Sequence, residues 1–321
     1  MPSSPSKIVS RILAAAVALL AGGAAAQEFP SRPIQLLVPY PPGSAVDLMA
    51  RPFAQLAEQA LGQRVLVLNR PGGTQTIAMN ALVNAQADGY TWAYTAVTPV
   101  TILPYRMKKL EYTPDSFIPV CQTFEVILYI AVGPSSPFNS LGDLVEHARA
   151  NPGRARYGTP GIASAAHLAA AELWQQLGVK LVDVPFTAMD AAAVQGIVKG
   201  DMEAGIVTTG VVLSQKLQPL AVFAPERQKI YPDVPTVAEL GHPIMPSGYG
   251  GVFLRSGTPP AVVARIDDAC RRSTNDPIYR SIAEKQFLAG TYLDSNAFRA
   301  RITADSRAKA ALIPTLHLPD H

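Results

Sequence analysis

The sequence has few of the residues that bind metal ions, since its 321 residues include only two cysteines and five histidines. Zinc and other transition-metal sites need several Cys or His side chains at short, regular spacings. No CxxC pair is present, and the histidines form no set of this kind. We therefore predict neither a metal ion nor a cofactor.

The two cysteines, Cys121 and Cys270, leave two alternatives open. Two buried thiols are the simpler interpretation, because spacing alone cannot show that the two Cβ atoms meet. A single long-range disulfide would be permitted in an oxidising compartment.

No long hydrophobic run follows the first 26 residues, so the sequence offers no good membrane-spanning helix. The apolar stretch at residues 12–20 is short, follows Lys7 and Arg11, and precedes small residues at 24–26. This is the layout of a cleavable signal peptide. We expect residues 1–26 to be removed before Gln27 and the mature protein to reside in the periplasm, with no cysteine available for a lipid anchor.

An excess of one charge is also missing. The formal net charge is +3, and removal of Lys7 and Arg11 leaves +1. Domains that bind nucleic acids usually carry a strongly basic face. We therefore predict no nucleic-acid partner.

Short β-branched runs alternate with amphipathic helical segments along the whole chain, which indicates an α/β fold with parallel strands. Met49, Phe53, Leu56 and Ala60, for example, recur at helical spacing. Strands are predicted at residues 34–38, 65–68, 91–95, 127–132, 156–158, 182–185, 204–207, 220–224 and 252–254.

The segments rich in Pro, Gly and Ser at residues 133–137 and 242–248 are typical of crossings between domains. About 295 residues, with 48% apolar composition, are enough for two cores. We predict one lobe from residues 27–130 plus 246–321 and a second lobe from residues 131–245.

The segment LVPYPPGSAVDLMAR at residues 37–51 leads from an apolar strand through a proline-rich turn into a helix. The free N–H groups of a helix's first turn attract anions. Gly43 lets the backbone approach a ligand, and Ser44 adds a hydroxyl. Asp47 would repel an anion, so we interpret it as a residue that caps and organises the loop.

A second strand-to-helix corner, YGTPGIASAAH, occupies residues 157–167. Ser164 is placed as the N-cap, and His167 follows in the first helical turn. A histidine at such a position is more often packed and hydrogen-bonded than catalytic. Two facing helix N-termini would nevertheless recognise a carboxylate without an arginine.

At these residues the chain resembles the substrate-binding receptors of tripartite tricarboxylate transporters, also called Bug proteins. The matching motifs are PPG at 41–43 with Asp47, NRPGG at 69–73, DGYT at 88–91, YG at 157–158 leading to Ser164 and His167, PDVPTVAE at 232–239 and GTP at 257–259.

The resemblance implies a two-lobed periplasmic binding protein, type II-like, that closes about a hinge of two crossing segments. It implies a monomeric receptor rather than an enzyme, which captures a small organic carboxylate and delivers it to a membrane permease with a large and a small subunit. Family members bind the carboxylate largely through backbone N–H groups. The expected ligand-binding residues are Tyr40, Gly43, Ser44, Ala45, Val46, Asp47, Thr74, Gln75, Thr98, Thr159, Gly161, Ile162, Ala163, Ser164, His167 and Phe186.

This chain departs from the family pattern in three places: Val46 replaces a small hydroxyl residue, Ile162 replaces a polar residue, and Thr187 follows Phe186 where a basic residue is usual. These changes predict a more apolar pocket that favours a monocarboxylate with an apolar or aromatic body over citrate. Arg70 or Arg106 would alter that preference if either side chain reached the cleft.

Two other functions use some of the same residues. A hydrolase could employ Ser164, His167 and Asp190, but no GxSxG elbow is present. A sensor that presents its ligand to a membrane signalling protein would use the same pocket and differ only in its partner.

Overall fold

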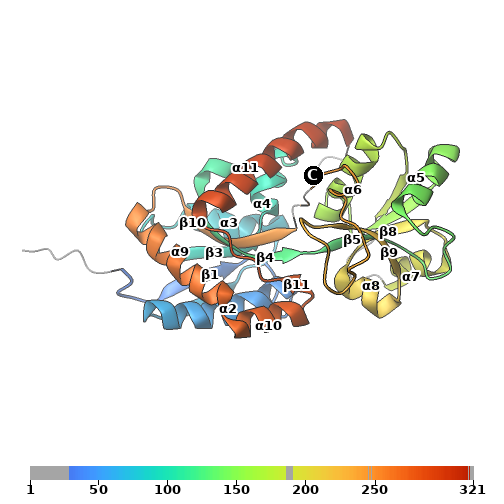
Figure 1. Cartoon of the computed structure of the whole chain (residues 1–321). Helices are drawn as coiled ribbons and strands as arrows, with labels where there is room; N and C mark the ends of the chain where they lie inside the picture. The colour runs from blue at the N-terminus through green and yellow to red at the C-terminus, as the bar shows by residue number, and fades with distance from the viewer. Residues whose placement is uncertain (1–28, 186–190, 245, 247, 317, 319–321) are drawn as a thin grey trace, which may run out of the picture.

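Residues 29–185, 191–244, 246, 248–316 and 318 are described by the computed structural model. The predicted signal peptide and Phe186 lie outside these residues. Two β-sheets, each covered by helices on both faces, form two lobes that lie side by side (Figure 1). The predicted two-lobed α/β fold is confirmed.

The first lobe contains a six-stranded sheet in the order β11-β4-β10-β3-β1-β2. β1 pairs in parallel with β2 and β3, whereas β10 runs antiparallel to β3 and β4. The strands are β1 (Ile34–Val38), β2 (Val65–Asn69), β3 (Thr91–Ala96), β4 (Phe117–Val126), β10 (Tyr249–Arg255) and β11 (Leu288–Ala289).

Helices bury both faces of this sheet. One apolar cluster joins the sheet to α2 (Ala45–Leu61), α9 (Pro260–Asn275) and α10 (Pro277–Lys285). The other joins it to α3 (Thr76–Val83), α4 (Thr98–Thr101) and α11 (Ser295–Leu312). Short 3₁₀ turns are η1 (Gly73–Gln75), η2 (Leu103–Tyr105), η3 (Pro114–Ser116) and η4 (Ile313–Leu316).

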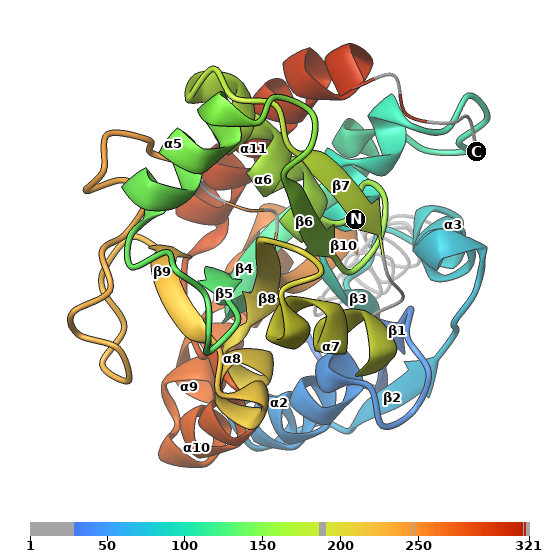
Figure 2. The same ribbon diagram turned by 90° about the vertical axis from the view of Figure 1, so that its right-hand side faces the viewer.

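The second lobe contains a five-stranded sheet in the order β7-β6-β8-β5-β9, seen from its own side in Figure 2. The strands are β5 (Leu128–Val132), β6 (Arg156–Thr159), β7 (Val182–Pro185), β8 (Ala204–Thr208) and β9 (Gln218–Phe223). One face packs on α5 (Leu141–Ala150) and α6 (Ala165–Gln176), and the other on α7 (Ala191–Lys199) and α8 (Thr209–Gln215).

Each strand that the sequence predicts corresponds to an observed strand, but β4 and β11 escape the prediction. β4 carries the polar residues Gln122, Thr123 and Glu125, all buried. Arg301 of α11 pairs with Glu125 at 2.5 Å and donates a hydrogen bond to Gln122. Buried polar groups need such partners, and a partner so distant in the sequence leaves no local pattern.

Cys121 of β4 and Cys270 of α9 form a disulfide, so the simpler interpretation of two free thiols is wrong. The two Cα atoms lie 6.4 Å apart, within the range that a disulfide spans. Both residues are fully buried in the first lobe. The bond links the central sheet to a helix that follows it much later in the chain.

The chain passes between the sheets twice. β4 ends at Val126 and β5 begins at Leu128, before the predicted division at residue 130, and the return is complete at Tyr249. The N–H of Val126 donates to the carbonyl of Gly248 at 2.6 Å, so the two crossing segments are hydrogen-bonded to each other.

The C-terminal helix makes a further connection between the lobes. α11 packs on the first lobe and extends toward α6 of the second (Figure 1). There Lys309, almost fully buried, lies 3.3 Å from Glu172 of α6. In the described part of the chain, no helix is long and apolar enough to cross a membrane.

Candidate functional site

The first corner lies where β1 leads into α2. Gly43 adopts a left-handed conformation with φ +83°, which glycine tolerates without strain. Ser44 then caps the helix, and its Oγ accepts a hydrogen bond from the N–H of Asp47. The predicted start of a helix at this corner is confirmed.

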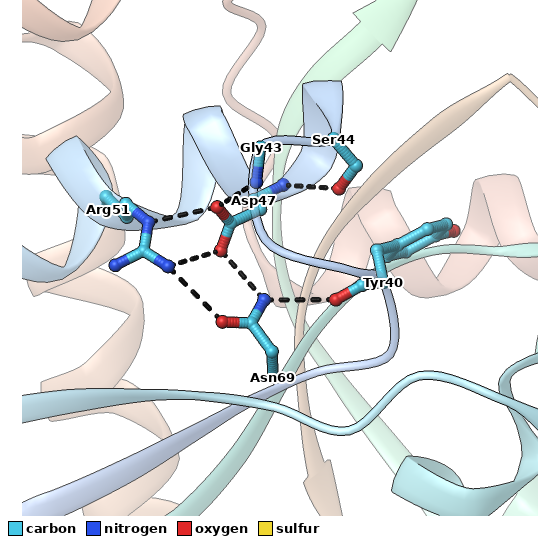
Figure 3. A network of polar contacts seen from close by, with 6 residues as sticks. All are labelled: Tyr40, Gly43, Ser44, Asp47, Arg51 and Asn69. Carbon is cyan, nitrogen blue, oxygen red and sulfur yellow. Dashed lines mark hydrogen bonds and ion pairs between the residues drawn. The ribbon is translucent and has the colours of Figure 1, made fainter.

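Asp47 organises this corner, as Figure 3 shows. Its buried carboxylate accepts hydrogen bonds from the N–H of Gly43 at 2.9 Å, from the Arg51 guanidinium at 2.9 and 3.0 Å, and from Asn69 Nδ2 at 2.8 Å. Burial alone would raise the pKa of Asp47, but these donors hold it below its ordinary value. Asn69 also donates to the carbonyl of Tyr40, which fixes the proline turn to the end of β2.

The second corner, between β6 and α6, repeats this arrangement. Ser164 caps α6 with φ −64° and ψ 160°, compared with −66° and 158° at Ser44. Ala163 precedes it with a positive φ of +59°, as Gly43 precedes Ser44. The N–H of Ala163 donates to Nδ1 of His167 at 3.0 Å, so His167 takes the position that Asp47 takes in the first corner.

The hydrogen bonds within the corners show which N–H groups already have an acceptor. The N–H groups of Gly43 and Ala163 are bound by Asp47 and His167, and those of Ser44 and Ser164 donate to Pro41 and Gly161 at 3.2 Å. The next N–H groups are those of Ala45 and Val46 in α2 and of Ala165 and Ala166 in α6. In the first turn of a helix such groups have no intrahelical acceptor.

A cavity of about 160 Å³ lies between the lobes. It brings together four of the predicted residues, Thr74, Thr98, Ile162 and Ala163, with Ile102, Leu103, Arg106 and Met107. Thr74 follows β2 and Thr98 follows β3, and β1 lies between these two strands in the sheet. The corner after β1 therefore emerges at the same edge of the sheet, where the carboxyl ends of parallel strands commonly bind ligands.

The loop after β2 has an unusual backbone. Gly72, Gly73, Thr74 and Gln75 all have positive φ angles, from +51° to +111°. Such conformations are strained for Thr and Gln and concentrate at functional sites. Thr74 of this loop is the residue that lines the cavity.

Residues 49–318 match the sequence model of the TctC family, which is described as the tripartite tricarboxylate transporter family receptor. The chain belongs to this family. BugT of Bordetella pertussis is 31% identical over 281 residues, which cover 85% of each chain. A TctC solute-binding protein from Polaromonas, solved without ligand, superposes with a TM-score of 0.83 at 30% identity, over 89% of this chain and 99% of that chain. An R. palustris protein solved with adipate shares the fold, with a TM-score of 0.71 at 22% identity over 92% and 100% of the two chains.

The protein is thus a periplasmic solute-binding receptor of the TctC type and not an enzyme. The geometry around Ser164 agrees with this, because its Oγ accepts the backbone N–H of His167 as a helix cap and the His167 ring is bound to Ala163. Asp190, the third residue of the hydrolase alternative, lies outside the described residues.

Three other residues that were predicted to bind the ligand, Tyr40, Val46 and Thr159, do not line this cavity. Tyr40 and Val46 pack against the core of the first lobe, and burial raises the pKa of the Tyr40 hydroxyl. Thr159 is fully buried, and its hydroxyl donates to Asp183 at 2.8 Å. These side chains support the corners from within the lobes.

His167 links the second corner to two charged residues that the sequence did not single out for this purpose. Its Nε2 lies 3.8 Å from Asp183 Oδ2. Burial lowers the pKa of His167, the Asp183 carboxylate opposes this, and the positive charge of Arg106 lowers it further. The ring is therefore held neutral, as its role as a hydrogen-bond acceptor requires.

Ile102, Leu103, Arg106 and Met107 also line the cavity but are not among the ligand-binding residues expected from the sequence. Of these, the sequence analysis named only Arg106, as a residue that would alter the ligand preference if it reached the cleft. All four belong to the segment TPVTILPYRM at residues 98–107, in which apolar residues hide any periodic pattern. Arg106 is the one cation in that segment. The charge of Arg106 was the only feature of that segment that could have indicated a binding role.

Proposed function

We propose that this receptor captures a small organic carboxylate between its lobes, through backbone N–H groups at the starts of α2 and α6. It then delivers the ligand to a membrane permease with one large and one small subunit. The observation that carries the proposal is the repetition of one capped corner in both lobes, with Gly43, Ser44 and Asp47 matched by Ala163, Ser164 and His167.

The repetition matters because it leaves the first two N–H groups of each helix, at equivalent positions, without an intrahelical acceptor. A helix N-terminus carries a partial positive charge that favours an anion. Hydrogen bonds to a charged acceptor are about twice as strong as neutral ones. Two such termini on opposite lobes would favour closure of the lobes around a carboxylate, without the need for a cationic side chain at the helix starts.

Closure requires a hinge, which we place at the crossings at residues 126–128 and 244–249. The hydrogen bond from Val126 to Gly248 couples the two segments, so they would bend together. Each lobe would move as a unit because its sheet is covered on both faces.

The experiment that tests carboxylate binding at the two corners removes the first helical N–H group from each of them. Proline is well accepted at the first residue of a helix, and the conformations of Ser44 and Ser164 suit a residue before proline. Ala45→Pro and Ala165→Pro should therefore fold normally. Each should weaken carboxylate binding about 10- to 100-fold, since a hydrogen bond to a charged group contributes about 1.5–3 kcal/mol.

Ala45→Ser and Ala165→Ser are the matched controls, because they keep the N–H group. Calorimetry with a panel of organic acids gives the affinities, and thermal melting checks the fold. Unchanged affinity in both well-folded proline variants would show that the carboxylate binds elsewhere.

Ligand uptake by cells tests whether the partner of the receptor is a permease. Loss of the receptor should abolish uptake of its ligand if a permease depends on it. Normal uptake, together with a lost transcriptional response to the ligand, would instead favour the sensor alternative.

A further inference from the structure

The last turn of α11 contacts both lobes. The preceding part of this helix belongs to the first lobe, because Phe298 and Ile302 lie in the apolar cluster that covers one face of the six-stranded sheet. A polar contact fixes it there as well, since the hydroxyl of Tyr249 in β10 donates to Asp305 at 3.2 Å. One turn further on, Lys309 meets α6 of the second lobe, toward which α11 extends in Figure 1.

The contact between the lobes at this point is an ion pair with one buried partner. Lys309 is 1% exposed, and its Nζ lies 3.3 Å from Glu172 Oε2 of α6 and 3.7 Å from Asp305 Oδ1 of its own helix. A buried ammonium group needs such partners, because its transfer out of water is unfavourable unless it is paired. Of the two carboxylates, that of Glu172 comes from the opposite lobe, and its side chain remains 24% exposed.

An apolar cluster accompanies this ion pair. It consists of Ile102, Leu312, Ile313 and, from α6, Leu168, all of them buried. Leu168 and Glu172 are four residues apart on α6, so they lie on the same face of that helix. Ile102 also lines the cavity between the lobes. The ion pair and the apolar cluster therefore form one contact between the C-terminal end of α11 and α6, beside the cavity.

The helix that this contact holds is the one that starts at the second corner. α6 begins at Ala165, directly after its cap Ser164, and Glu172 lies only about 10 Å further along the helix axis. A contact at Glu172 therefore also fixes the position of the N–H groups at the start of α6. α11 in turn is one continuous helix, Ser295–Leu312, anchored in the first lobe. The contact thus sets where the second corner lies relative to the first lobe.

We propose that Lys309 and Glu172 are positioning residues for ligand capture, whose ion pair forms when the lobes close and holds the start of α6 opposite the start of α2. This inference rests on the proposed function of the two corners. Opening about the crossings at residues 126–128 and 244–249 would carry α6 away from α11 and break the pair. Lys309 would then keep Asp305 as its partner, and Glu172 would be solvated. Closure is therefore reversible, because neither charge is left buried and unpaired.

The test uses Glu172→Gln, which keeps the size of the side chain and removes its charge. Calorimetry first selects, from benzoate, nicotinate, adipate, malate, glutamate and citrate, the acid that the wild-type protein binds most tightly. Glu172→Gln should bind this acid about 5- to 30-fold more weakly, an effect between those of exposed and buried ion pairs. Stopped-flow kinetics should show that the loss is mainly faster dissociation, because the pair forms only after the ligand has entered and the lobes have closed.

Lys309→Met completes a double-mutant cycle. Because the two side chains act as a pair, the double variant should bind the acid about as weakly as Glu172→Gln, rather than with the product of the two losses. Glu239→Gln is the matched control, since it breaks an ion pair with Arg227 that lies within the second lobe. It should leave the affinity and the dissociation rate unchanged within about twofold. Thermal melting checks that each variant is folded.

Wild-type affinity and dissociation rate in folded Glu172→Gln would overturn the inference and leave the receptor function intact. Losses that multiply in the double variant would also overturn it, because they would show that the two side chains act separately. Failure of the wild-type protein to bind any acid of this panel would instead contradict the proposed function itself.

Discussion

Asp47 and His167 hold equivalent positions in the two corners, but they respond to pH in different ways. Asp47 is ionised, and its donors Arg51, Asn69 and the Gly43 N–H keep its pKa low. His167 is neutral and accepts the N–H of Ala163 through Nδ1. The second corner is therefore the one that protonation disrupts, as the pH falls through the lowered pKa of His167.

The direction in which stability changes with pH follows from the pKa of His167. Burial and Arg106 lower this pKa from 6.5, against the opposing effect of Asp183. In the unfolded chain His167 keeps its ordinary pKa, so it binds a proton before the folded protein does. The stability that depends on the neutral ring is complete above about pH 6.5 and decreases as the pH falls below that value.

We predict that ligand affinity also falls as the pH drops through the lowered pKa of His167, by up to about tenfold per pH unit for one linked proton. His167→Asn keeps an acceptor for Ala163 and does not titrate, so its affinity should stay nearly constant. Calorimetry with one acid, from pH 8 down to the lowest pH at which both proteins stay folded, makes the comparison. Equal pH profiles for the two proteins would show that His167 does not control the corner.

Among the elements, the parallel strands and their following helices were predictable from sequence, because alternation and capping residues are local. Ser44 and Ser164 were recognisable as caps for the same reason. β4 was not, since its buried Gln122 and Glu125 are satisfied by Arg301 from the far end of the chain. The disulfide likewise depends on β4 and α9 meeting in space.

We predict that this disulfide contributes strongly to stability. Its cysteines are 149 residues apart in the sequence, and the loop-entropy model gives about 5 kcal/mol for a loop of this size. Urea unfolding of Cys121→Ala/Cys270→Ala should show a loss of up to that amount, matched by the reduced wild-type protein. Ligand binding should persist under native conditions, because the bond lies within the first-lobe core. Equal stability of the oxidised and reduced proteins would contradict this role.

At the scale of the whole molecule, the sequence predicted two lobes, two corners and four of the residues that line the cavity, but not the contribution of the 102–107 segment. The cavity takes Thr74 and residues of the 98–107 segment from one lobe and Ile162 and Ala163 from the other. No spacing in the sequence relates these residues, because their proximity results from the packing of the lobes. The contact of Lys309 with Glu172 is of the same kind.

The central claim is that one carboxylate ligand binds both corners at once. Hydrogen–deuterium exchange, with and without the tightest-binding acid of the panel, tests it most directly. We predict slower exchange in peptides that cover residues 43–48 and in those that cover residues 162–168, with no change in α9. Protection of only one corner, or of neither, would contradict the account.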